Sequence, residues 1–189
     1  MPFKIKAENA NDIYVSKLKE ELHSVPGFDY KSYDAAAQFC LTAKTNLDQA
    51  MLWAEAAVSM PGLGQTNFST LSTKALVLSA TGKNAEAATL MQTALRLPIT
   101  TPLEIHQYGR QLISMKKNAE ALEVFKYNAQ RNGDAWPVHV GLARGYSAMG
   151  DNKLALEHAK QALPQAPDDL NRQSLETMIK TLSEGQSIQ

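Results

Sequence analysis

Residues 136–167 read WPVHVGLARGYSAMGDNKLALEHAKQALPQAP, and the order of small, apolar and turn-forming residues in this stretch decides the fold. The same order occurs twice more, at steps of 34 residues towards the N-terminus. The repeated positions are a turn position and two positions in the helix after it: Gly82, Lys116 and Gly150; Ala87, Ala121 and Ala155; Met91, Phe125 and Ala159. A fixed period in this range predicts an array of helical hairpins.

Each repeated residue type has a physical reason. Ala143 and its counterparts Ala75 and Gly109 are small because the two helices of a pair cross at close range there. Glycine at the turn position accepts the left-handed backbone that ends many helices. A single pair cannot bury its apolar face alone, so neighbouring pairs must stack to form a core.

The spacing predicts helix pairs at about 31–62, 68–98, 102–133 and 136–167, with a capping helix at 168–184. An extra helix precedes the first pair, and we expect residues 9–189 to form a single repeat domain. In residues 1–8, Phe3 and Ile5 alternate with Lys4 and Lys6, which is typical of a strand. This segment is either a simple tail or the end of a domain that lies upstream.

The first pair departs from the strict period, which would place Gln38 at the close helix crossing. A buried amide needs hydrogen-bond partners that the neighbouring turn does not offer. We therefore predict that the turn near Thr45 contains one extra residue and that Ala37 takes the crossing position.

The pattern resembles the tetratricopeptide repeat, a unit of two helices whose hallmarks are matched by Leu142-Ala143, Tyr146, Gly150-Asp151, Ala155 and Pro167. The resemblance implies an all-α, right-handed α-α superhelix of about four helix pairs with a flanking helix at each end. It also implies a groove, lined by the first helix of each pair, that binds a protein or a peptide.

A closer resemblance covers nearly the whole chain. The stretches that carry it include residues 32–41, 64–75, 108–112 and 140–146. They look like the C-terminal region of a family of bacterial proteins in which an uncharacterised, mostly β domain precedes the repeats. This resemblance implies that the chain is a fragment of a longer, exported protein, and it brings no known activity.

The composition of the chain argues against several classes of function. The 189 residues contain 19 Lys plus Arg and 19 Asp plus Glu, so the formal net charge is zero. Nucleic-acid binding and attraction to anionic lipid both favour a basic excess, so neither is expected as a general role. No run of apolar residues is long enough to insert into a membrane, and the first residues lack the apolar core of a signal peptide. The single Cys40 cannot form an internal disulfide, and the sequence leaves the compartment open.

The candidate binding residues are the groove-facing positions of the repeat. Arg110 and Arg144 occupy equivalent places in adjacent repeats, and neighbouring helices pack roughly 10 Å apart. Both guanidinium groups can therefore reach one extended acidic or carboxylate-bearing segment, which the planar fork of arginine pairs with bidentately. The alternative is that both arginines are solvated or paired with nearby glutamates. The other groove-facing candidates are His106, Gln107, Ser114, Thr73 and Leu76.

Three function hypotheses follow, and an interaction or scaffold module that binds a peptide in its groove is the first. In the second, the repeats pack against an upstream domain of the same polypeptide and hold no separate ligand. In the third, the chain is part of an enzyme. No sequence motif supports this hypothesis, because neither a phosphate loop nor a nucleophile elbow is present. No two histidines share the spacing of a helical metal site, so no metal, cofactor or catalytic residue is predicted.

Overall fold

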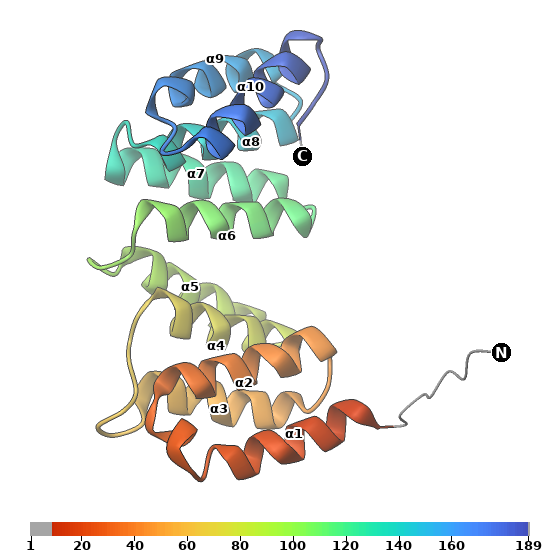
Figure 1. Ribbon diagram of the computed structural model, residues 1–189, viewed down its shortest axis with the longest axis vertical. Coiled ribbons are helices and arrows are strands. Elements are labelled where there is room, and N and C mark those ends of the chain that lie inside the picture. Colours follow the sequence, from red (N-terminus) through yellow and green to blue (C-terminus); the bar gives the residue numbers. More distant parts are fainter. Residues whose placement is uncertain (1–8, 189) are drawn as a thin grey trace, which may run out of the picture. The chain divides into compact units, whose positions relative to one another are not determined.

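The computed structural model describes residues 9–188, and within them all regular secondary structure is helical (Figure 1). The prediction of an all-α fold built from consecutive helix pairs is confirmed. The strand predicted around Phe3–Lys6 lies outside the described residues. The chain divides into two compact units, Met1–Thr100 and Thr101–Gln189, and each is described by itself.

The first unit contains α1 (Ala10–Glu21), the short 3-10 helix η1 (Val25–Phe28), and two helix pairs. The pairs are α2 (Tyr30–Ala43) with α3 (Leu47–Ser59), and α4 (Phe68–Ala80) with α5 (Asn84–Arg96). Ala37 is fully buried at the contact of the first pair, whereas Gln38 is exposed. The predicted insertion near Thr45 is therefore confirmed.

The second unit contains two further pairs and a final helix. The pairs are α6 (Pro102–Ser114) with α7 (Asn118–Asn132), and α8 (Trp136–Ala148) with α9 (Asn152–Ala162). The short helix η2 (Leu163–Gln165) leads to α10 (Asp169–Ser183), which packs on α9. The repeat alanines Ala121, Ala143 and Ala155 are all fully buried, as the crossing argument requires.

Phe125, on α7, is the largest fully buried side chain of the structure. Three glycines surround its ring: Gly109 on α6, and Gly141 and Gly145 on α8. A Cβ atom added at Gly109 would lie 2.3 Å from Cε1 of the ring, and one at Gly141 would lie 2.5 Å from Cδ1. Glycine at these sites lets α6 and α8 approach α7 around the aromatic ring. We call Phe125 with these three glycines the glycine cradle.

The turn position of the repeat adopts a left-handed backbone in all three copies. The φ angle is 85° at Gly82, 87° at Gly150 and 63° at Lys116. Glycine has no Cβ to clash in this conformation, whereas a side chain costs about 1–2 kcal/mol there.

We therefore expect Lys116→Gly to raise the free energy of unfolding of the second unit by about 1 kcal/mol. The measurement is urea denaturation followed by the fluorescence of Trp136, in a Trp53→Phe background that removes the tryptophan of the first unit. Gly150→Ala is the matched control and is expected to lower stability by a similar amount. A neutral or destabilising Lys116→Gly would contradict the argument.

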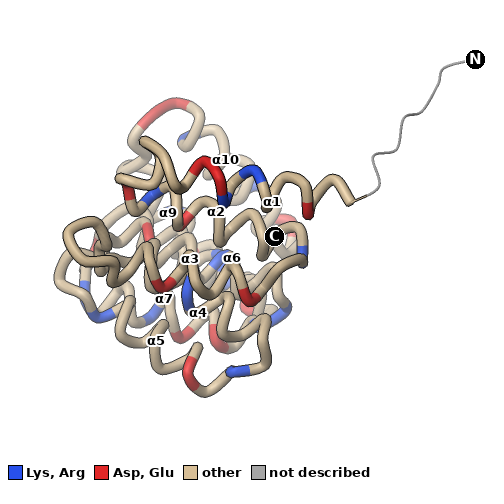
Figure 2. The backbone as a smooth tube through the Cα atoms, turned by 90° about the horizontal axis from the view of Figure 1, so that it is seen from below, with Lys and Arg blue, Asp and Glu red and all other residues tan. Residues whose placement is uncertain are grey.

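Charged residues of both signs are interspersed along the chain, without a long block of either sign (Figure 2). Among the described residues, no helix combines the length and the apolar character that a membrane crossing requires.

Candidate functional site: a pocket lined by two arginines

A pocket of about 480 Å³ lies in the second unit, between α6, α8 and the segment that follows α10. Arg110 and Arg144 both line it, so the structure brings together the two arginines that the repeat placed in equivalent positions. The remaining lining residues are mostly small or polar: Ile113, Ser114, Lys116, Asn118, Ser147, Ala148, Gly150, Ser187 and Ile188. We call this cavity the arginine pocket.

The charged residues that line the arginine pocket are all basic. Three lining residues are basic, Arg110, Lys116 and Arg144, and no aspartate or glutamate is among the lining residues. Burial and, to a smaller extent, the nearby positive charge of Arg110 together lower the pKa of Arg144 to about 10. Arg110 is exposed and Arg144 is half-buried, and two like charges close to each other favour an anion between them.

A second cavity of about 470 Å³ adjoins the first, because Arg144, Ser187 and Ile188 line both. Its other lining residues come from α10: Ser174, Thr177, Met178 and Thr181. This cavity also has no acidic residue in its lining. Arg144 is therefore the one charged side chain that both cavities share.

His106 differs from the expectation of a groove-facing side chain, because only 5% of it is exposed. Its ring lies tilted against Phe125, with ring centroids 5.8 Å apart, and its Nδ1 atom faces Gly141. Gly141 leaves room for the ring between the helices, because a Cβ atom added there would lie 3.2 Å from Nδ1 of His106. Burial lowers the pKa of His106 to about 4, and the positive charges of Arg144 and Arg110 act in the same direction. His106 therefore lies next to both arginines as a neutral ring and does not line the pocket.

The other predicted groove residues are divided between the two units. Ser114 lines the arginine pocket, and its hydroxyl donates to the Gln111 carbonyl at 2.7 Å. Gln107 is exposed on α6 but does not line the pocket. Thr73 and Leu76 belong to α4 of the first unit, where Thr73 is buried and its hydroxyl accepts a hydrogen bond from Gln38 at 3.1 Å.

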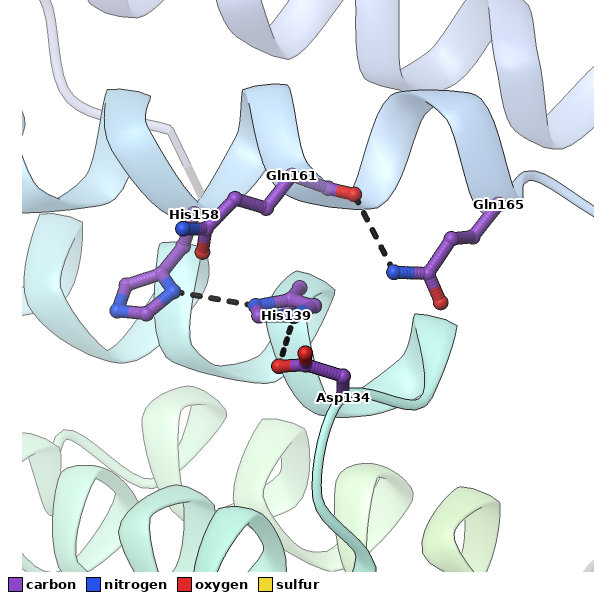
Figure 3. Close-up of polar contacts among 5 residues, drawn as sticks. All are labelled: Asp134, His139, His158, Gln161 and Gln165. Carbon is purple, nitrogen blue, oxygen red and sulfur yellow. Dashed lines mark hydrogen bonds and ion pairs between the residues drawn. The ribbon is translucent and has the colours of Figure 1, made fainter.

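Sequence reasoning missed a polar chain between α8 and α9 (Figure 3). Nδ1 of His139 lies 3.2 Å from Nδ1 of His158, and Nε2 of His139 lies 3.1 Å from a carboxylate oxygen of Asp134. Burial lowers the pKa of His158, and His139 lowers it further. The two rings meet because of the register of α8 against α9. The spacing of the histidines along the chain does not reveal this register. No group of three metal-binding side chains occurs in the described part of the chain.

Comparison with known proteins supports the repeat. The family model described as tetratricopeptide repeat matches residues 112–179, which begin in α6 and end in α10 of the second unit. This part of the chain is similar to the tetratricopeptide repeat, a helical class that generally mediates protein–protein interaction or scaffolding. None of the curated proteins compared with the chain matches it.

Proposed function

We propose that the chain is a non-catalytic protein-interaction module whose arginine pocket binds an extended, acidic segment of a protein partner. The observation that carries the proposal is the pair of arginines, one from each of two packed helices, at a cavity whose lining contains no acidic residue. A hydrogen-bonded carboxylate would relieve the repulsion between the two guanidinium groups and would pair with the planar fork of arginine in two-point contacts.

The neighbouring surface favours a peptide over a small anion. The two adjoining cavities provide about 480 and 470 Å³, and apolar groups such as Ile113 and Met178 lie beside the charged ones. Alternate side chains of an extended segment point to opposite sides. A segment that alternates acidic and aliphatic residues therefore fits a site with one charged and one apolar side.

The probe for this proposal is a fluorescein-labelled hexapeptide of alternating glutamate and isoleucine. We expect it to bind the chain with an affinity that Arg110→Glu lowers at least tenfold, because the change replaces attraction with repulsion at the pocket. Arg144→Gln is expected to weaken binding in the same direction. Fluorescence anisotropy measures the binding, and circular dichroism checks that each variant keeps its helices.

Lys160→Glu serves as the matched control, because Lys160 is exposed on α9 and does not line either cavity. This charge reversal should leave the affinity unchanged, and hexapeptides with glutamine or lysine in place of glutamate should bind weakly. If the acidic peptide binds no better than the lysine peptide, or if Arg110→Glu has no effect, the proposal is wrong. That outcome would favour the second hypothesis, in which the repeats pack on another domain of the same polypeptide.

A further inference from the structure

The segment after α10 folds back onto the second unit instead of extending away from it. Gly185 adopts a φ angle of 76°, and the next amide, of Gln186, donates to the Thr181 carbonyl at 3.1 Å. Residues 185–188, which we call the tail, then lie against α8 and the start of α9. The left-handed glycine thus ends the helix and reverses the chain.

Two side chains hold the backbone of the tail. The Asn152 amide donates to the Gly185 carbonyl at 3.0 Å, and the Ile188 amide donates to the Ser147 hydroxyl at 2.8 Å. The Ser187 hydroxyl also donates to the Asn152 side-chain oxygen at 3.2 Å. Most of these bonds contact the peptide backbone, so they do not depend on the amino-acid sequence of the segment they hold. An extended segment of another protein would satisfy Ser147 and Asn152 equally well.

The Ile188 side chain anchors the tail in an apolar seat. It packs against two apolar clusters, one that contains Val140 and Met178 and one that contains Ala143 and Leu182, and it is half-buried. An aliphatic side chain therefore already occupies the place next to Arg144 that a ligand residue would need.

The tail also lines both cavities. Ser187 and Ile188 line the cavity on α6 and α8 as well as the cavity on α10, as Arg144 does. The tail thus lies within the site that the proposed ligand would need.

From these contacts we infer that the tail is an autoinhibitory segment: it occupies the backbone site on Ser147 and Asn152 and the aliphatic seat of Ile188, and an acidic–aliphatic partner segment must displace it to bind. This inference rests on the proposed function. Among the described residues, the contacts that hold the tail are a few hydrogen bonds and one half-buried side chain, each of modest strength. The apparent affinity of a ligand is then its intrinsic affinity multiplied by the fraction of molecules in which the site is open.

The test compares the full chain with a variant that lacks residues 186–189, using the labelled glutamate–isoleucine hexapeptide as the probe. If the tail leaves the site open in about a tenth of the molecules, its removal should tighten binding about tenfold. Ile188→Gly, which removes only the aliphatic anchor, should shift the affinity in the same direction. Gln186→Ala is the matched control, because no contact of the tail described above uses the Gln186 side chain, and it should have no effect.

Hydrogen exchange of the Ile188 amide provides a second readout on the full chain. This amide donates to Ser147 in the bound tail, so adding the unlabelled hexapeptide should increase its exchange rate. Unchanged or weaker binding of the truncated chain, with binding that still depends on Arg110, would overturn the inference and leave the proposed function standing. Absence of acidic-peptide binding in both the full and the truncated chain would overturn the proposed function and the inference together.

Discussion

Replacing Phe125 with alanine is expected to lower the free energy of unfolding of the second unit by about 3–5 kcal/mol. The ring is fully buried and fills the space between α6, α7 and α8, so its removal leaves a cavity that three packed helices cannot readily close. Denaturation in urea, followed by Trp136 fluorescence in the Trp53→Phe background, measures the loss.

The glycine cradle can be tested more directly by combining a change at Gly109 with the change at Phe125. In the wild-type chain, Gly109→Ala would place a Cβ atom 2.3 Å from the Phe125 ring, and overpacking of this kind costs about 1–3 kcal/mol or more. With Phe125→Ala already present, the added methyl group enters empty space. The double variant should therefore be more stable than the sum of the two single changes predicts. Additive losses would show that the glycine is present for another reason.

Acidification is expected to destabilise the second unit through His106. The pKa of His106 is about 4 in the folded chain against 6.5 for an ordinary histidine, so the unfolded chain takes up the proton first as the pH falls. The stability contributed by the neutral ring is fully present above pH 6.5. It is lost progressively between about pH 6.5 and pH 4, and it amounts to about 3 kcal/mol at 1.36 kcal/mol per pKa unit.

The groups around His106 give this effect its direction. Arg110 on its own helix and Arg144 on α8 oppose a second positive charge, and Phe125 on α7 offers no hydrogen bond. Only the Pro137 carbonyl, which accepts a hydrogen bond from the ring, acts to raise the pKa. The burial of the ring is the largest cause.

His106→Gln is the control for this prediction, because an amide can still donate to the Pro137 carbonyl but does not titrate. Urea denaturation between pH 7 and pH 4 should show a loss about 3 kcal/mol larger in the wild-type chain than in the variant. The His139–His158 pair and the carboxylates remain in both proteins, so their contribution cancels in the comparison. Parallel stability curves would contradict the assignment of the low pKa to His106.

The sequence predicts the helix pairs well because the signals that define them are local. Ala121, Ala143 and Ala155 repeat at a fixed step, and Gly150 marks a turn within a few residues of the helices it joins. The equivalence of Arg110 and Arg144 follows from the same step, so their meeting at one pocket could also be predicted.

The features that were missed depend on how particular helices pack. His106 was expected at the surface of the groove, but Gly141 admits its ring beneath that surface. The contact between His139 and His158 depends on the register of α8 against α9. The return of the tail depends on Ser147 and Asn152, which lie far from Ile188 along the chain.

The glycine cradle also restricts the order in which this sequence can change during evolution. A methyl group at Gly109 or Gly141 would clash with the aromatic ring, so such a change by itself destabilises the protein. A smaller residue at position 125 leaves a cavity, so either first change is costly, and each makes the other more acceptable. The four positions therefore drift as one unit.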